Sequence, residues 1–312
     1  MTPPRPGTGR LSFTDLPNAL RDRIAKALGS PVTHAVTPPG GFGHQLAATL
    51  TLADGRRYFT KAAPDDDALT AANLHEAAVL ESFPPDAPAA SLIGVYQEGG
   101  WTAVVIEHLD GTHPDLRPKS ADPERVWVLL DQLTSQPAPP AYTEAVSDRP
   151  SPAATLHGWT QIASASPADL DPEARARLAA LTEIEAAWPK LARGDRIVHG
   201  DLRADNMVHD RHKGVIFVDW AHATTGPACI DAVSLAPQLI LAGARPGDVA
   251  KALETHPASA SDPDTATAFL TALTGHWQRN ARLPSPPGAP GLRAYQHRAA
   301  AAGLSLLVQR LR

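Results

Sequence analysis

The chain has 312 residues and a formal net charge of −5, with 43% hydrophobic and 20% charged residues. This composition can build a sizeable core and excludes a wholly disordered chain. A single cysteine, Cys229, excludes an internal disulfide framework. The negative net charge gives no sign of a nucleic-acid partner. No apolar run in the sequence is long enough to span a membrane, so we expect no membrane partner. The first ten residues, MTPPRPGTGR, lack the apolar core of a signal peptide, so we expect a cytoplasmic protein.

The first third of the chain predicts a small lobe with two β-hairpins and two helices. Apolar residues at four-residue spacing predict the first helix, and apolar runs on both sides of the turn ADGRR predict the first hairpin. The expected segments are a disordered leader over 1–12, helices over 14–28 and 71–83, and strands over 46–52, 58–62, 91–96 and 102–109. They predict a small antiparallel lobe over 13–108, with acidic N-caps for the second helix in PDDD.

From residue 109 onward the pattern becomes mainly helical and predicts a larger second lobe over 109–312. The expected elements are helices over 124–133, 174–192, 229–241, 246–255, 264–280 and 291–311, and short strands at 197–198 and 215–220. Five prolines fall within residues 136–152. We therefore expect no regular element there, and the composition leaves open whether the segment is a mobile lid or a linker.

The stretch IVHGDLRADNMVHDRHKGVIFVDW, residues 197–220, carries the most chemical information. Asp201 is followed by Asn206 five residues later and by Asp219 thirteen residues further on. Phosphoryl transfer from a nucleotide needs such a set, because one carboxylate orients and deprotonates the attacking hydroxyl while an amide oxygen and a second carboxylate hold Mg²⁺. We therefore predict Asp201 as the base and Asn206 and Asp219 as the metal ligands.

These motifs resemble those of the aminoglycoside phosphotransferase and choline kinase-like family, small-molecule relatives of the protein kinases. HGDLRADN matches the H-G-D-x-x-x-x-N loop of that family, and VDW matches its metal-binding segment. The resemblance implies an α+β, two-lobed protein-kinase-like fold with a small antiparallel-sheet N-lobe and a larger, mainly helical C-lobe. It also implies ATP and Mg²⁺ as cofactors, with GTP as an open alternative to ATP.

The resemblance extends upstream to the part of the chain that would bind the nucleotide. A glycine-rich loop covers the phosphates in the family, and PPGGFGHQ, with Gly40, Gly41 and Gly43, occupies that place. The strand lysine that holds the phosphates is matched by Lys61. The chain has six lysines against 22 arginines, so a lysine at this position is informative.

Two further features of the nucleotide site are carried over by the same resemblance. The helix glutamate that positions the lysine matches Glu76, with Glu81 as the alternative that helical phase leaves open. The segment that joins the lobes, VVIEHLDG, implies main-chain contacts of Glu107 and Leu109 with the base and Ile106 behind it.

Three residues around the catalytic loop also have counterparts in the family. His199 is expected to pack the loop rather than to exchange protons. Arg203 is expected either to lie near the transferred phosphate or to form an ordinary surface salt bridge. Asp231, in GPACIDAVSL, is expected to brace the loop through hydrogen bonds.

Two alternative functions follow from the same residues. A transition-metal hydrolase would use a His/Asp cluster within 199–222, although its H-x-x-H pair at 209–212 fits a solvated hairpin tip. The cluster would consist of His199, His209, His212 and His222 with Asp201, Asp210 and Asp219. A non-catalytic nucleotide-binding scaffold is the second alternative, but the acidic, amide and lysine positions are all filled.

The expected acceptor is a hydroxyl group on a small molecule. A polycationic aminoglycoside needs a cleft lined by carboxylates. Residues 226–312 contain five acids against eight arginines and lysines. The sequence therefore favours a nucleoside-type antibiotic or another hydroxylated metabolite at least as much as an aminoglycoside, and it leaves the oligomeric state open.

Overall fold

The N-terminal lobe of the computed structural model is built on one five-stranded antiparallel sheet, with the strand order β1-β2-β3-β5-β4. The structure describes residues 10–38, 43–149, 156–286 and 289–311. The lobe contains β1 (Val32–Val36), β2 (Leu46–Leu52), β3 (Arg57–Pro64), β4 (Leu92–Glu98), β5 (Trp101–Glu107), the 3-10 turn η1 (Phe13–Asp15), α1 (Asn18–Leu28) and α2 (Ala68–Ser82).

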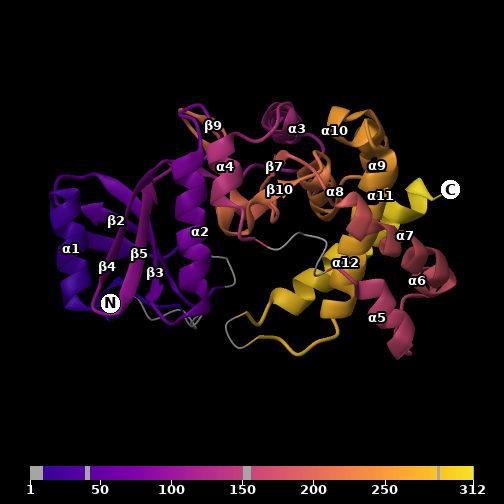
Figure 1. Ribbon diagram of the computed structural model, residues 1–312, viewed down its shortest axis with the longest axis horizontal. Coiled ribbons are helices and arrows are strands. Elements are labelled where there is room, and N and C mark those ends of the chain that lie inside the picture. The colour runs from indigo at the N-terminus through magenta and orange to yellow at the C-terminus, as the bar shows by residue number, and fades with distance from the viewer. Residues whose placement is uncertain (1–9, 39–42, 150–155, 287–288, 312) are drawn as a thin grey trace.

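The sheet lies between α1 and α2 (Figure 1). Successive side chains of a strand point to opposite faces, and β5 follows this alternation. Ala103 and Val105 are buried in the apolar cluster that contains α1, whereas Val104 and Ile106 are buried in the cluster that contains α2. The second cluster continues into the C-terminal lobe, so α2 packs against both lobes.

The C-terminal lobe is mainly helical, with two small antiparallel sheets of order β10-β7 and β6-β8-β9. Its strands and 3-10 turns are β6 (Gly111–Thr112), β7 (Arg196–Val198), η3 (Ala204–Asn206), β8 (Met207–Asp210), β9 (Gly214–Phe217), η4 (Trp220–His222) and β10 (Thr224–Gly226). Its helices are α3 (Asp122–Thr134), α4 (Pro140–Ala145), α5 (Gly158–Ala165), α6 (Pro172–Ala176), α7 (Leu178–Leu191), α8 (Ile230–Leu241), α9 (Pro246–Thr255), α10 (Pro257–Ala260), α11 (Pro263–Asn280) and α12 (Leu292–Arg310).

Helix α11 is largely buried and packs against α5, α7 and α12. Its crossing with α5 is close, because a Cβ atom on Gly158 would lie 1.9 Å from the carbonyl oxygen of Gly275. Only glycine fits such an approach of two backbones. Among the residues that the structure describes, none of the helices combines the length and apolar character needed to span a membrane.

The proline-rich segment 136–152 differs from its prediction, because residues 140–145 form helix α4. Pro139 and Pro140 lie at the start of the helix, where the missing N–H group has no intrahelical partner in any case. Tyr142 is completely buried, and its hydroxyl lies 3.2 Å from the carbonyl oxygen of Val198 and 3.0 Å from that of Thr224. Residues 150–152 lie outside the described part of the chain.

The predicted ends of the leader and of several helices and strands also differ from those in the structure. Residues 10–12 are placed against the N-terminal lobe, with the amide of Leu11 bonded to the carbonyl of His44 at 3.1 Å, while residues 1–9 lie outside the described chain. The first helix begins only after Pro17, and the helix expected over 174–192 is divided at Arg177. The strand expected over 215–220 ends at Phe217.

Candidate active site

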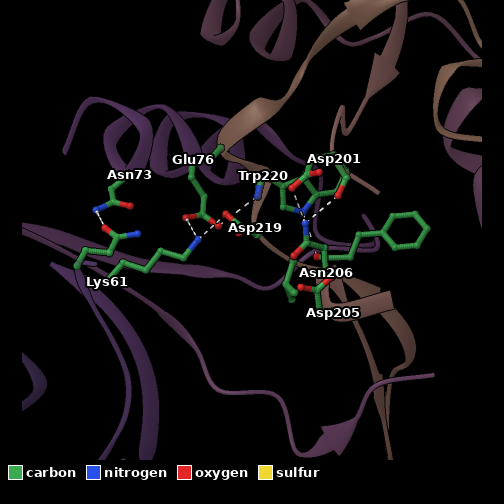
Figure 2. Close-up of polar contacts among 12 residues, drawn as sticks. Lys61, Asn73, Glu76, Asp201, Asp205, Asn206, Asp219 and Trp220 are labelled. Carbon is green, nitrogen blue, oxygen red and sulfur yellow. Dashed lines mark hydrogen bonds and ion pairs between the residues drawn. The ribbon is translucent and has the colours of Figure 1, made fainter. Parts of the chain in front are cut away.

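The buried Lys61 lies between two carboxylates, that of the buried Glu76 and that of the partly exposed Asp219 (Figure 2). Its Nζ atom lies 2.7 Å from Oε2 of Glu76 on α2 and 2.8 Å from Oδ1 of Asp219. Burial alone would lower the pKa of Lys61, but the two carboxylates more than offset this and raise it. Lys61 is therefore a fixed cation, and its helix partner is Glu76, since Glu81 is exposed.

Asp219 owes its orientation to an unusual backbone conformation. Its φ of 66° lies in the left-handed region, which is sparsely populated by residues other than glycine and costs about 1–3 kcal/mol. The next residue, Trp220, is buried and donates its backbone N–H to Oε1 of Glu76 at 3.2 Å. Burial raises the pKa of Asp219, but Lys61 lowers it to about 2, so the carboxylate is ionised at neutral pH.

Asp201 and Asn206 are joined by two hydrogen bonds within the loop that follows β7 (Figure 2). Nδ2 of Asn206 donates to the carbonyl oxygen of Asp201 at 2.7 Å and to its carboxylate at 3.0 Å. Both bonds use the amide nitrogen and leave the amide oxygen of Asn206 for another ligand. Burial raises the pKa of Asp201, and the nearby Arg203 only partly opposes this.

His199 is a neutral structural residue of this loop. Its Nε2 bonds the carbonyl oxygen of Val218 at 2.9 Å, and its Nδ1 accepts the backbone N–H of Asp201 at 3.3 Å. One ring nitrogen thus donates and the other accepts, as in the uncharged imidazole. Burial lowers the pKa of His199 to about 4, in agreement with this form.

Asp231, at the start of α8, accepts the two backbone N–H groups that begin the loop. Its oxygens lie 2.6 Å from the nitrogen of His199 and 3.0 Å from that of Gly200. Gly200 has a φ of 80°, and a Cβ atom there would lie 2.5 Å from the carbonyl oxygen of His222. Burial raises the pKa of Asp231 to about 6, although both hydrogen bonds oppose the shift.

Arg203 is largely enclosed rather than at the open surface, with 13% of its side chain exposed. Its guanidinium forms two hydrogen bonds to Asp205, at 3.1 and 3.2 Å, and lies 3.6 Å from the carboxylate of Asp201. It also lies over the ring of Tyr295 on α12, 5.5 Å from the ring centroid. The position of Arg203 is therefore fixed from two sides of the C-terminal lobe.

The segment that joins the lobes is held by the turn between β8 and β9. Oε1 of Glu107 lies 2.5 Å from Nζ of Lys213, and Oε2 accepts the backbone N–H of Ser91 at 3.1 Å. The carboxylate of Asp210 accepts the backbone N–H of Asp110 at 2.7 Å. The side chain of Glu107 is thus occupied by contacts within the protein.

The N-terminal lobe, the segment that joins the lobes and the loop that carries Asp201 all line one cavity of about 600 Å³. Its lining includes Gly43, Ile106, Glu107, Leu109, Lys61, Glu76, Asp201, Arg203, Asn206 and Asp219, as predicted, and also Arg10, Gln45, Phe59 and Asn73, which the sequence analysis missed. Gly40 and Gly41 lie outside the described residues. Phe59 precedes Lys61 by two positions on β3 and so lies on the same face, which strand periodicity alone indicates.

Of the four histidines of the hydrolase alternative, His222 lines the cavity and the other three do not. His199 bonds to Val218, while Nδ1 of His209 lies 3.2 Å from Asp122, and His209 belongs to β8 rather than to a hairpin tip. In the described residues no group of three or more His, Cys, Asp or Glu side chains is arranged to hold a metal ion. The geometry therefore gives the hydrolase alternative no support.

The fold and the cavity between its lobes define a kinase-like protein. Residues 36–270 match the Phosphotransferase enzyme family, and because this match covers most of the chain, the chain belongs to that family. The resemblance inferred from the motifs is thereby confirmed. No curated protein matches the sequence.

Solved structures similar to this chain share its fold at low identity. Choline kinase LicA from Streptococcus pneumoniae has a TM-score of 0.58 at 13% identity, over 91% of this chain and 96% of that chain. An aminoglycoside phosphotransferase from Alicyclobacillus acidocaldarius has a TM-score of 0.56 at 16% identity, over 90% of this chain and 92% of that chain. A thermostable mutant of aminoglycoside phosphotransferase APH(4)-Ia, in a ternary complex with ADP and hygromycin B, has a TM-score of 0.54 at 13% identity, over 92% of this chain and 98% of that chain. These likenesses confirm the predicted kinase-like α+β fold.

Proposed function

We propose that this chain is a kinase that transfers the γ-phosphoryl group of ATP to a hydroxyl group of a small molecule, with Mg²⁺ as cofactor. The observation that carries the proposal is the meeting of two hydrogen-bonded groups at one cavity. Lys61, Glu76 and Asp219 form the first, and Asp201 and Asn206 form the second. Residues 13–108 would bind the nucleotide, and residues 109–312 would carry the catalytic loop and the acceptor site.

The nucleotide would lie with its base against the segment that joins the lobes. Ile106 and Leu109 line the cavity there. The backbone N–H of Glu107 already donates to the carbonyl oxygen of Ser91 at 2.9 Å, so Glu107 would offer the base only its carbonyl oxygen. Gly43 lines the same cavity. Lys61, held in place by Glu76, would bind the α- and β-phosphates as a compact cation.

The donor set fits Mg²⁺, because it offers the amide oxygen of Asn206 and the ionised carboxylate of Asp219. These residues would hold the ion, which neutralises phosphate charge when bound. Asp201 would accept the proton of the acceptor hydroxyl while the acceptor oxygen bonds to the γ-phosphorus and the bond to the bridging oxygen of ADP breaks. Arg203, beside Asp201, would stabilise the charge on the transferred group. His199 and Asp231 would hold the loop that carries these groups.

The described lining of the cavity has an excess of carboxylates over cations, which suits a cationic or mixed-charge acceptor. Besides its carboxylates it contains Arg203, which lies within 3.6 Å of Asp201 and reduces the attraction for a polycation. Similar structures are described as an aminoglycoside phosphotransferase bound to hygromycin B and as a choline kinase, so hydroxylated antibiotics and amino alcohols are the first acceptors to test.

A direct test is to incubate the protein with ATP, Mg²⁺ and a panel of such acceptors and to measure products by mass spectrometry. The panel includes aminoglycosides, nucleoside-type antibiotics and amino alcohols. The proposal predicts a product heavier by one phosphoryl group for at least one acceptor, only with Mg²⁺. Tight binding of nucleotide without product across the panel would favour a non-catalytic scaffold.

A further inference from the structure

Arg10, in the segment expected to be a disordered leader, reaches the connection between β1 and β2. Its Nε donates to the carbonyl oxygen of Gly43 at 3.2 Å, and one terminal nitrogen donates to that of Pro38 at 3.4 Å. Arg10 therefore contacts the chain both before and after the glycines at 40 and 41. The side chain lines the same cavity as Lys61 and Asp219.

The guanidinium of Arg10 has donors to spare inside this cavity. Arginine carries five N–H donors, and the two hydrogen bonds within the described chain use two of them. Burial lowers the pKa of Arg10, and the negative charge of Asp219 opposes this shift, so the two groups lie within electrostatic range. Arginine remains protonated in proteins, so a partly desolvated cation faces the cavity with unused donors.

The charge balance of the cavity shows why such a cation matters. Its described lining contains more acids than cations. The acids are Glu76, Glu107, Asp201, Asp205 and Asp219, and the cations are Arg10, Lys61 and Arg203. Lys61 is already shared between Glu76 and Asp219, which together exceed its charge. Arg10 reduces this local excess of negative charge, as Mg²⁺ would when bound.

We propose that Arg10 is a second phosphate-binding cation, which acts with Lys61 in the nucleotide site. This inference rests on the proposed function. A guanidinium suits phosphate oxygens because its N–H groups form charge-assisted, often paired, hydrogen bonds. Arg10 therefore contributes to binding the phosphates and not the base.

The chain after the glycine-rich segment is held independently of Arg10. Nε2 of His44 lies 2.6 Å from the carboxylate of Asp67, and Nδ2 of Asn73 donates to Oε1 of Gln45 at 2.6 Å. Both contacts tie this part of the chain to the N-terminal half of α2. A substitution of Arg10 is therefore expected to leave the fold intact.

The test compares Arg10→Gln, Arg10→Lys and the control Arg23→Gln by isothermal titration with Mg-ATP, Mg-ADP and adenosine. Arg23 lies on α1 and pairs with Glu98 at the surface, 3.6 Å away. Arg10→Gln keeps a donor for the loop carbonyls and removes the charge. We expect it to weaken Mg-ATP binding about tenfold or more, as for a lost charge-assisted hydrogen bond, and to leave adenosine binding unchanged.

The outcomes separate this inference from the proposed function. Partial recovery in Arg10→Lys, unchanged binding in Arg23→Gln and a smaller loss for Mg-ADP than for Mg-ATP would support a phosphate contact. An equal loss for adenosine, or no loss for Mg-ATP, would overturn it while the proposed function stands. If the unsubstituted protein bound Mg-ATP no more tightly than adenosine, the nucleotide site itself would be refuted.

Discussion

Glu76→Gln removes one carboxylate from the buried network around Lys61 and keeps the size of the side chain. The Nζ–Oε2 distance of 2.7 Å corresponds to about 6 kcal/mol of attraction at an effective dielectric constant of 20. The substitution loses less than this attraction, because a neutral amide costs less free energy to bury than a carboxylate. Breaking a buried ion pair typically lowers the free energy of unfolding by about 3–5 kcal/mol. Burial raises the pKa of Glu76 despite Lys61, so its charged form is costly to bury, and Lys61 keeps Asp219 at 2.8 Å. We therefore expect a loss no larger than the lower end of this range, about 3 kcal/mol.

Glu81→Gln is the matched control, because Glu81 lies on the same helix, five residues away, and is exposed. Urea unfolding followed by tryptophan fluorescence gives the free energy of unfolding of each variant, and a Mg-ATP titration gives its nucleotide affinity. We expect Glu76→Gln to lower both and Glu81→Gln to change neither, since surface substitutions have small effects. Equal results for the two variants would refute the assignment of Glu76 as the residue that positions Lys61.

Two further predictions concern stability. The pKa of His199 is lowered to about 4, against about 6.5 unfolded, so its neutral form stabilises the fold above pH 6.5 and this contribution, about 3 kcal/mol, is lost as the pH falls to 4. Asp231, with a raised pKa of about 6, changes the stability in the opposite direction over part of this range. The test therefore compares the free energy of unfolding of His199→Gln with that of the unsubstituted protein, by urea unfolding at pH 7 and at pH 4.5. The same difference between the two proteins at both pH values would contradict a buried neutral imidazole. Tyr142→Phe leaves the carbonyls of Val198 and Thr224 without their shared donor and is expected to cost about 1–2 kcal/mol of unfolding free energy, whereas no loss in urea unfolding would show that these contacts contribute nothing.

The proximity of Asp201, Asn206 and Asp219 was predictable because these residues lie within a short stretch of sequence. Asp201, Asn206 and Asp219 are separated by a fixed loop and one hairpin, so their spacing already constrains their geometry. The choice between Glu76 and Glu81 was different. Residues five positions apart on a helix point in clearly different directions, so only the packing of α2 on the sheet decides which one meets Lys61.

The missed residues depend on contacts between distant parts of the chain. Arg10 reaches Gly43 across 33 positions, and Asn73 reaches Gln45 across 28, which no local periodicity indicates. Helix α4 was missed for another reason. The prolines of its segment argued against regular structure, yet two of them lie where a helix tolerates proline, at its beginning.

The most direct test of the account is phosphoryl transfer by Asp201→Asn, measured by mass spectrometry with ATP, Mg²⁺ and an acceptor that the unsubstituted protein phosphorylates. The substitution removes the carboxylate that takes up the proton and keeps the size of the side chain. We expect the rate to fall about 10²-fold or more, as for loss of a general base, while Mg-ATP affinity stays close to that of the unsubstituted protein. Transfer at an unchanged rate would contradict the central claim that Asp201 is the catalytic base of a kinase.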